Sequence, residues 1–392
     1  MRKFKMKQVV LRGPLLTASG YGEHSRQVFR WATSNKDWNV KTQLTPWGNT
    51  TWYINPDLLS GLVGNIMQRS GPLERVGSDI SIQIQLPNEW DPMLARYNIG
   101  VTAAVETDVC NPEWIEACNK MDLIIVPTKH TRQTLMNSGN VSVPVEVIPE
   151  AYFDELTDCK IEKLELGLST KFNFLMIGTL TGNNPWNDRK NTYCTLKWFC
   201  ETFKDNPDVG LVIKASSGRA TTFDRMLTKG ALKQLLSEIR EGPYPKVSLL
   251  HGLMSGDEMS ALYRDDTIKC FIGLTRGEGF GLPILEAAVS SIPVIATNWS
   301  GHLDFMNKGK FLSVNYCLTE IHESRVDNGI FIKGSRWAEP SEEHFKNRLK
   351  KFYEKPQMPQ EWASDLGKKL KETHSISSII EKYNEVSAAR IK

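Results

Sequence analysis

The sequence predicts an α/β protein built from two Rossmann-like domains, and three observations support this. Apolar runs of strand type alternate with helical patterns through residues 8–297, which indicates βαβ units and a mainly parallel sheet. The length of 392 residues, 40% of them hydrophobic, suffices for two hydrophobic cores. A charged and then turn-rich segment, 161–171, interrupts the alternation near the middle. We therefore expect one domain over residues 1–168 and a second over residues 169–365.

The first domain is expected to open with a strand, a glycine-bearing turn and a helix, and then to repeat strand and helix after a looser region. Each strand is a short apolar run bounded by polar or turn residues, and each helix shows apolar residues at helical spacing. The expected strands are 8–15, 40–46, 80–86, 99–105, 123–127 and 143–148, and the expected helices are 21–32, 112–119 and 129–138.

The second domain repeats this alternation. Ser255 and Glu258 form a capping box at the start of one of its helices. The expected strands are 172–177, 209–215, 247–251, 270–274 and 293–297, and the expected helices are 191–203, 222–240, 256–263 and 283–290. From Glu339 onward the chain is charged and of helical type, and residues 366–392 are expected to form a terminal helix.

Composition limits the class of protein. No apolar run is long enough to span a membrane, and the basic N-terminus lacks the apolar stretch of a secretory signal, so a cytoplasmic protein is expected. The seven cysteines are scattered, as in a protein with reduced thiols, and no histidine cluster of zinc-binding type occurs. A net charge of +3 permits an anionic ligand but does not require nucleic acid.

The stretch from Phe271 to Ser300 carries the clearest functional signal. Glycines 277, 279 and 281 surround Glu278, which suits a turn whose backbone comes close to a ligand. Pro283 then begins a helix that carries Glu286 one turn in. Free N–H groups at a helix start attract phosphate, whereas the two acids would repel it. Both facts are satisfied if the acids hold neutral hydroxyls and the backbone amides between them face a diphosphate.

The segment EGFGLPILE, residues 278–286, resembles the E-x7-E signature of retaining GT-B glycosyltransferases, in particular family 4. The resemblance implies a GT-B fold, with two Rossmann-like domains facing a central cleft, the nucleotide-sugar donor held mainly by the second domain and the acceptor mainly by the first. It also implies that the terminal helix, residues 366–392, crosses back to the first domain. It implies no cofactor besides that co-substrate, with a UDP-sugar favoured. The implied donor-binding residues of this segment are Glu278, Gly279, Phe280, Gly281, Leu282 and Glu286.

The same segment has two simpler interpretations. An ordinary turn and helix with an acidic first turn would look similar. A dinucleotide-binding Rossmann motif does not fit, because Leu282 stands where its third glycine is needed.

A basic loop at residues 188–191 resembles the family loop that brings a lysine to the donor diphosphate. Lys190 is the matching residue and is expected to act in catalysis with Glu278. The family usually places an arginine after the strand's glycine, but Thr179 follows Gly178 here, so a second cation must come from Arg189, Lys214 or Arg276. A solvated basic loop is the alternative. The resemblance implies metal-independent transfer, because cations and backbone amides would neutralise the leaving diphosphate.

Two positions of the first domain are further candidates. Gly20, in the turn Ser19-Gly20-Tyr21-Gly22, is expected to lie near the donor at a strand's carboxyl end. A simple helix cap by Ser19 is the alternative. Glu106 stands where many family members have a histidine, and it is expected to orient a sugar hydroxyl, stabilise charge or accept a proton. Asp108 nearby is equally suited to cap the following helix.

Aromatic residues mark two other loops. Trp47, Trp52 and Tyr53 lie in a polar loop of the first domain and are expected to stack on an acceptor, although they could equally cover the core. Trp299 follows a strand of the second domain within Asn298–His302 and could contact the donor, although a buried tryptophan more often serves the core.

The acceptor is the least determined part. The segment 98–135 resembles glycosyltransferases of T4-like bacteriophages, which implies a hexosyl- or pentosyltransferase acting in the host cytoplasm on 5-hydroxymethylcytosine in double-stranded DNA. The basic residues Arg2, Lys3, Lys5 and Lys7 would then lie near the mouth of the cleft, as would the aromatic loop. A glycan or lipid acceptor of bacterial surface polysaccharide synthesis is an alternative, and so are a GT-B sugar epimerase or phosphorylase and an inactive nucleotide-sugar binding module.

Overall fold

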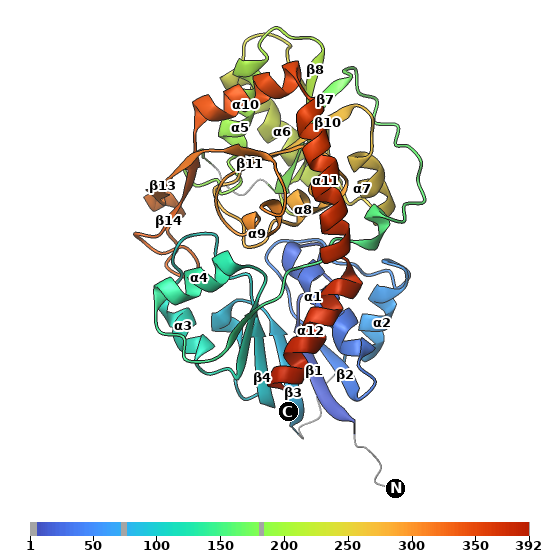
Figure 1. The fold of residues 1–392 in the computed structure, drawn as a ribbon, viewed down its shortest axis with the longest axis vertical. Coiled ribbons are helices and arrows are strands. Elements are labelled where there is room, and N and C mark those ends of the chain that lie inside the picture. Colours follow the sequence, from blue (N-terminus) through green and yellow to red (C-terminus); the bar gives the residue numbers. More distant parts are fainter. Residues whose placement is uncertain (1–5, 72–76, 180–183, 392) are drawn as a thin grey trace. The chain divides into compact units, whose positions relative to one another are not determined.

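The structure, a computed structural model, describes residues 6–71, 77–179 and 184–391 (Figure 1). Arg2, Lys3 and Lys5, which were predicted near the mouth of the cleft, lie outside the described residues. The chain divides into two compact units, Met1–Ala151 with Ile376–Lys392, and Tyr152–Ser375. None of the helices in the described part is long and apolar enough to cross a bilayer.

The first unit is a parallel six-stranded sheet in the order β2-β1-β3-β4-β5-β6. Its strands are β1 (Lys7–Gly13), β2 (Trp38–Leu44), β3 (Ser78–Ile84), β4 (Ala95–Val101), β5 (Leu123–Val126) and β6 (Val145–Val147). Its helices in this part are α1 (Gly20–Ser34), α2 (Leu62–Arg69), α3 (Pro112–Cys118) and α4 (Lys129–Ser138). The sheet reverses its strand order between β1 and β3, so the loops after these two strands diverge there.

The last helix, α12 (Ile376–Arg390), completes the core of the first unit. Ile379 and Tyr383 are buried among the side chains of α1 and the sheet. The Tyr383 ring stacks on Trp31 with 4.7 Å between ring centroids, and Trp31 Nε1 donates to Asn384 Oδ1 over 3.0 Å. Apolar contact and a satisfied indole N–H therefore hold the C-terminus to residues that precede it by more than 300 positions.

The second unit contains another parallel six-stranded sheet, in the order β12-β11-β10-β7-β8-β9. Its strands are β7 (Phe172–Thr179), β8 (Val209–Ser216), β9 (Lys246–Leu250), β10 (Ile268–Gly273), β11 (Val294–Thr297) and β12 (Leu312–Val314). Its helices are α5 (Thr192–Thr202), α6 (Thr222–Ile239), α7 (Gly256–Tyr263), α8 (Leu282–Val289), α9 (Leu303–Met306), α10 (Glu342–Glu354) and α11 (Gln357–Thr373).

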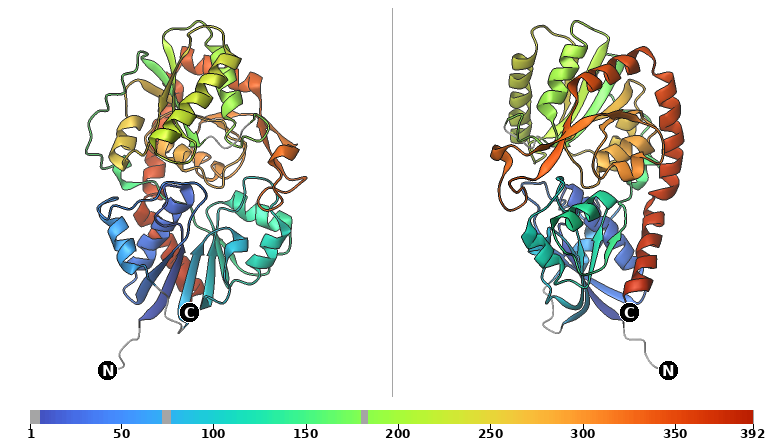
Figure 2. Two further views of the ribbon diagram at one scale, coloured as in Figure 1. Left: turned by 180° about the vertical axis from the view of Figure 1, so that it is seen from behind. Right: turned by 60° about the vertical axis from the view of Figure 1, so that its left-hand side comes forward.

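Both faces of this second sheet are covered (Figure 2). Apolar residues of α7, α8 and α11 form one core with residues such as Leu175 and Phe271. Residues of α5, α6 and α10 form the other core with Phe174 and Ile272, the sequence neighbours that point to the opposite face. Burial on both sides explains why these strands are continuous apolar runs.

Three features differ from the sequence expectations. The division falls at residue 151 and not at 168, because Tyr152 and Leu156 are buried in the core of the second unit. Glu339 lies in a strand, because β13 (Tyr316–Glu320) pairs antiparallel with β14 (Arg336–Pro340), and helix α10 begins only at Glu342. Most β13 side chains are exposed, so the strand lacks an apolar signal. The terminal helix starts at Ile376, since Leu366 still belongs to the second unit.

Candidate donor site and comparison with known proteins

The predicted donor residues of the second unit lie at the carboxyl ends of its central strands, at the topological switch point of the sheet. Strands β7 and β10 are neighbours, yet the chain continues from β7 toward β8 on one side and from β10 toward β11 on the other. The loops at their carboxyl ends therefore diverge and leave room for a ligand, as in other open α/β sheets. Lys190 follows β7 and Glu278 follows β10, so the strand order brings these residues together.

Several hydrogen bonds tie the two loops to one another. Asn191 Nδ2 donates to the Leu274 carbonyl over 3.2 Å, and Arg276 N donates to the Arg189 carbonyl over 2.9 Å. Arg189 Nη1 donates to the Gly277 carbonyl over 2.7 Å. Because both loops start from adjacent strands and are bonded again beyond them, their relative position is well defined.

Lys190, Arg189 and Glu278 form the charged centre of the site. Lys190 Nζ lies 2.7 Å from Glu278 Oε1, and Arg189 Nη1 lies 3.4 Å from Glu278 Oε2. All three side chains are at most 16% exposed. Burial raises the pKa of Glu278, but the charges of Lys190 and Arg189 outweigh it and lower that pKa to about 2. The carboxylate therefore stays ionised, and two cations lie beside it.

The backbone before α5 fixes the direction of the Lys190 side chain. The buried Asp188 carboxylate accepts from Lys190 N over 3.0 Å and from Thr192 N over 2.6 Å. Asn191 between them adopts a left-handed conformation with φ of 54°. Asp188 thus accepts hydrogen bonds from amide groups at the start of α5, a role that the sequence did not predict.

Arg276, one of the predicted second cations, is committed elsewhere. Its guanidinium is 2% exposed and forms two hydrogen bonds with the Glu339 carboxylate, of 2.8 and 3.0 Å. Its Nη1 also donates to the carbonyls of Pro185 and Asp188, each over 2.7 Å. Arg276 therefore stabilises the basic loop through its backbone carbonyls. Arg189 is the second cation that, with Lys190, contacts Glu278.

The glycine-rich turn is held by the loop after β11. Glu278 N donates to Ser300 Oγ over 2.9 Å, and Gly301 N donates to the Glu278 carbonyl over 2.9 Å. A Cβ on Gly301 would lie 2.1 Å from the Gly279 carbonyl oxygen, so only glycine permits this approach. The predicted loop Asn298–His302 thus supports the turn through Ser300 and Gly301.

His302 completes a directed chain of hydrogen bonds behind Glu278. Its ring is fully buried, and Nε2 lies 2.8 Å from the carbonyl oxygen of Thr297. A carbonyl only accepts, so Nε2 carries the proton and Nδ1 is an acceptor. Ser300 Oγ, 3.4 Å from Nδ1, can then donate to His302 while it accepts from Glu278 N. Burial lowers the pKa of His302, which favours this neutral form.

Glu286, on α8, lies near two further polar residues, Tyr263 and Lys214. Tyr263 donates from its hydroxyl to Glu286 Oε2 over 2.8 Å. Lys214, at the end of β8, donates to the Gly252 carbonyl over 3.3 Å. Burial lowers the pKa of Lys214, and the charge of nearby Glu286 opposes this shift. The sequence contained no signal for Tyr263, which lies at the end of α7 and reaches Glu286 only through the fold.

The remaining residues of the motif take other positions. Phe280 is 3% exposed and packs on Phe305 with 5.2 Å between ring centroids, so its side chain belongs to the core. Leu282 packs against the same core. Gly281 caps α8 in a left-handed conformation with φ of 99°, and Pro283 occupies the first turn. Phe280 can therefore reach a ligand only through backbone groups, whereas the Leu282 side chain is partly exposed.

A small hollow lies beside this charged centre. Lys190 and Glu278 line it together with Gly273, Thr275 and Pro283. Lys190 and Glu278 bring charge to a wall that is otherwise largely apolar, a combination typical of small-molecule sites.

The first unit gathers another group at the carboxyl ends of β1 and β4. Ser19 accepts from Gly22 N over 3.0 Å and so caps α1, as the simpler interpretation had predicted. The close backbone approach is at Gly22, where a Cβ would lie 2.2 Å from the Thr17 carbonyl oxygen, and not at Gly20. Tyr21 stacks on Trp47 with 3.9 Å between ring centroids, and its hydroxyl accepts from Ala103 N over 3.0 Å.

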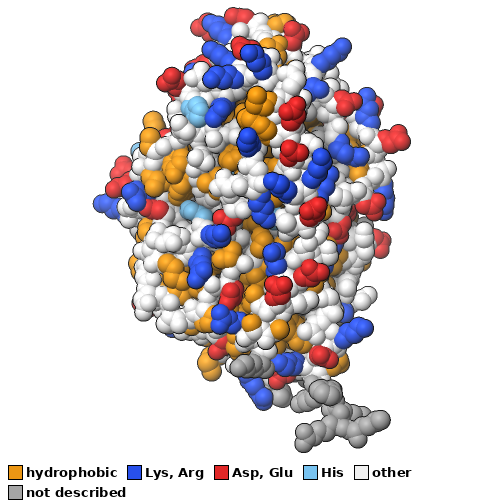
Figure 3. All heavy atoms as spheres, viewed as in Figure 1, with side chains coloured by type: hydrophobic (Ala, Val, Ile, Leu, Met, Phe, Trp, Pro, Cys, Tyr) orange, Lys and Arg blue, Asp and Glu red, His pale blue; other side chains and the backbone are white. Residues whose placement is uncertain are grey.

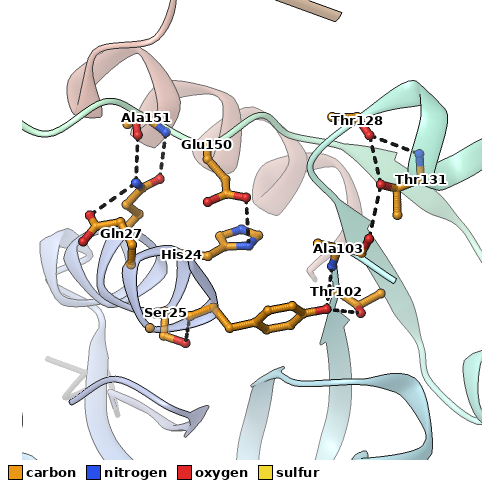
Figure 4. A network of polar contacts seen from close by, with 12 residues as sticks. His24, Ser25, Gln27, Thr102, Ala103, Thr128, Thr131, Glu150 and Ala151 are labelled. Atoms are coloured by element: carbon orange, nitrogen blue, oxygen red, sulfur yellow. Dashed lines mark hydrogen bonds and ion pairs between the residues drawn. The ribbon is translucent and has the colours of Figure 1, made fainter. Parts of the chain in front are cut away.

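Polar contacts tie α1 to the segment after β6 (Figure 4). Gln27 exchanges two hydrogen bonds with the backbone of Ala151, of 2.9 and 2.7 Å. His24 Nδ1 lies 3.8 Å from the Glu150 carboxylate, and both side chains are buried. This network stabilises the unit beside the β1–α1 turn, and the sequence analysis had missed it because its members show no motif.

The other predicted residues of the first unit are spread around this turn. Trp52 is 39% exposed and forms an isolated antiparallel β-bridge with Thr17. Tyr53 is partly buried, and the central carbon of the Arg26 guanidinium lies 5.2 Å from the centroid of its ring. Glu106 is half-buried in the loop after β4. The cap of α3 is Asn111, which accepts from Glu113 N over 3.0 Å, so the proposed cap by Asp108 was wrong.

Part of the second unit is similar in sequence to known glycosyltransferases. Residues 201–368 match the family model described as glycosyl transferases group 1. A probable sucrose-phosphate synthase from Thermosipho melanesiensis is 23% identical over 203 residues, which cover 51% of this chain and 41% of that protein. The chain thus matches less than half the length of this curated relative.

Solved structures share the fold over nearly the whole chain. Anabaena Alr3699/HepE in complex with UDP and glucose is 14% identical, with a TM-score of 0.63 and coverage of 98% of this chain and 100% of that chain. A UDP-forming trehalose-phosphate synthase from Burkholderia xenovorans is 13% identical, with a TM-score of 0.63 and coverage of 98% and 99%. At such identities the likeness concerns the fold, and it confirms the expected GT-B class. The chain has the GT-B fold, and its residues 201–368 match the model of the glycosyl transferases group 1 family.

Proposed function

We propose that this protein is a retaining glycosyltransferase that moves a sugar from a nucleotide-diphosphate sugar to an acceptor hydroxyl. The observation that carries the proposal is the pairing of Lys190 and Arg189 with Glu278 at the switch point of the second sheet. Two cations there suit a diphosphate, whose negative charge grows when the bond to the sugar breaks. The family match of residues 201–368 supports the same reaction class.

The roles of the charged residues follow from their chemistry. An ammonium group has three N–H donors, so Lys190 can contact Glu278 and a diphosphate oxygen together. Glu278 stays ionised and is suited to accept hydrogen bonds from hydroxyl groups of the sugar. Glu286, further along α8, would hold the ribose hydroxyls. In the reaction the bond from the anomeric carbon to the diphosphate breaks, and the nucleoside diphosphate departs with the electron pair. A bond to the acceptor oxygen forms, and the acceptor's hydroxyl proton passes to an oxygen of the departing diphosphate.

UDP-glucose is the first donor to test. Alr3699/HepE is described in complex with UDP-glucose and with UDP and glucose, and the Burkholderia xenovorans enzyme is described as UDP-forming. We further propose metal-independent transfer, because Lys190 and Arg189 can neutralise the diphosphate. Transfer that stops with EDTA and resumes with magnesium or manganese would contradict this part.

Two acceptor classes enter the proposal. The resemblance of residues 98–135 to phage enzymes supports 5-hydroxymethylcytosine in duplex DNA, while the similarity to synthases of sucrose phosphate and trehalose phosphate supports a sugar or sugar phosphate. Trp47 over Tyr21 offers an aromatic surface for either acceptor. Figure 3 shows basic and acidic side chains interspersed on one face, which is not the continuous basic surface typical of DNA-binding proteins.

The decisive experiment incubates the protein with labelled UDP-glucose and separate acceptors. The panel contains duplexes with cytosine or 5-hydroxymethylcytosine, hexoses, hexose phosphates and a polyprenyl phosphate sugar. Transfer that retains the anomeric configuration supports the proposal and identifies the acceptor class. Epimerised nucleotide sugar as the product would instead indicate an epimerase, and UDP-glucose binding without any turnover would indicate a binding module.

A further inference from the structure

Helix α6 exposes an apolar surface that the donor site does not use. Phe223, Met226 and Leu227 are 68%, 66% and 52% exposed. Their spacing of three and four residues places them on one side of the first turns of the helix. We call these three residues the α6 patch. Figure 2, left, shows α6 in front, on the outer side of the second unit.

The helix that carries the α6 patch is fixed to the rest of the second unit by buried contacts. Asp224, Thr228 and Leu232, on the opposite side of the helix, are buried. The Asp224 carboxylate accepts from Ser217 N and Arg219 N over 3.0 and 3.1 Å, and His251 Nε2 lies 2.6 Å from it. These contacts anchor the start of α6 to the ends of β8 and β9, so the α6 patch is presented to the surroundings by a fixed helix.

Basic residues run along one side of the patch. Arg225, Lys229 and Lys233 are exposed and follow one another at intervals of four residues. Between residues 219 and 234 the single acid is Asp224, which is 6% exposed and bonded to its own loop. The exposed surface of the first three turns thus combines large apolar side chains with positive charge.

We propose that the α6 patch docks on a membrane surface that contains anionic lipids. Phe, Met and Leu side chains can enter the boundary between headgroups and acyl chains, while the flanking Arg and Lys side chains contact lipid phosphates. No spanning segment is needed for such binding. The sequence argues only against long apolar runs, and three apolar residues spaced along one side of a helix do not form such a run.

Two other occupants fit less well. A symmetric antiparallel contact between the α6 patches of two copies would bring Arg225 and Lys229 of both copies together, and like charges would oppose it. Nucleic acid would use the basic side chains but offers no apolar partner for Phe223, Met226 and Leu227 outside a deformed duplex.

Vesicle sedimentation tests the proposal with the full-length protein. Vesicles of phosphatidylcholine alone and of phosphatidylcholine with 30% phosphatidylglycerol would be compared at two salt concentrations. Each basic residue near an anionic surface contributes roughly fivefold to binding. We expect binding to the anionic vesicles that weakens with salt, and a drop of about tenfold or more for Phe223→Ser/Leu227→Ser and for Arg225→Gln/Lys229→Gln.

Matched controls are Met358→Ser, which removes another exposed methionine, and Lys368→Gln, which removes an exposed lysine of α11. Both should bind vesicles like the wild type, and circular dichroism would verify that every variant is folded. Equal binding of all variants, or no binding to either vesicle, would overturn the proposal. Duplex DNA binding lost with the charge variant alone would assign the surface to nucleic acid, and a concentration-dependent dimer lost in the serine variant would assign it to a second copy.

Discussion

Lys190 Nζ and Glu278 Oε1 lie 2.7 Å apart although 88 positions separate the two residues. Neighbouring strands β7 and β10 bring them together, and Arg189 approaches the other carboxylate oxygen. A carboxylate with a pKa of about 2 between two cations keeps its charge at every pH at which the protein would be assayed. This arrangement is the basis of the proposal that Glu278 binds sugar hydroxyl groups and that the two cations bind a diphosphate.

Replacement of Lys190 by alanine tests the role of this cation. We expect Lys190→Ala to lower kcat for glycosyl transfer by about 10²–10³, the range found when one preorganised donor to a developing charge is removed. Lys197→Ala is the matched control, because Lys197 is an exposed lysine on α5. A Lys190 variant with wild-type kcat would refute the assignment.

Glu286 is expected to bind the nucleotide and not the sugar. Glu286→Ala should weaken UDP and UDP-glucose alike, by about 1.5–3 kcal/mol for the loss of hydrogen bonds to a charged group. Tyr263→Phe, which removes only the hydroxyl that donates to Glu286, should have a smaller effect. Isothermal titration with both ligands makes the comparison, and unchanged affinity for free UDP would rule the ribose role out.

Arg276 is expected to stabilise the second unit and not to catalyse. Arg276→Met leaves two carbonyls and the Glu339 carboxylate without their donor, which should lower the free energy of unfolding by about 3 kcal/mol. Arg325→Met, at a more exposed ion pair, should cost no more than about 1 kcal/mol. Urea unfolding of both variants tests this, and equal losses would contradict the structural role.

The hydroxyl of Ser300 is expected to position Glu278. Ser300→Ala removes the acceptor of the Glu278 amide, which should lower kcat roughly fivefold for a hydrogen bond of about 1 kcal/mol. Ser290→Ala is the control, because that buried hydroxyl has no hydrogen-bond partner among the described residues. Steady-state kinetics of the two variants should differ, and equal rates would show that the Ser300 bond does not matter.

His302 should make the stability of the protein depend on pH. Burial lowers its pKa in the folded protein, whereas an unfolded histidine titrates near about 6.5. Below that pH the unfolded chain takes up a proton that the folded chain does not, so the free energy of unfolding falls as pH falls. Between pH 7 and 5 this decrease should be smaller in His302→Asn than in the wild type. Identical slopes in urea unfolding would count against a neutral buried ring.

Much of this architecture was determined locally. Apolar runs and helical spacing predicted α4 and α7 to the residue and most other elements within a few positions, because both periodicities act over neighbouring residues. The spacing of Glu278, its glycines, Pro283 and Glu286 likewise identified the turn and helix α8, because turn chemistry and helix starts depend on adjacent residues.

Only the tertiary structure decided which side chains face the site. Phe280 lies in the core although its neighbours Gly279 and Gly281 lie in the turn. Arg276 binds Glu339, which lies in strand β14, whereas the sequence predicted a charged helical segment there. The order of the strands sets these contacts. Burial and pairing depend on residues that are distant in the chain, and no local pattern of charge or hydrophobicity encodes which distant partner a side chain meets.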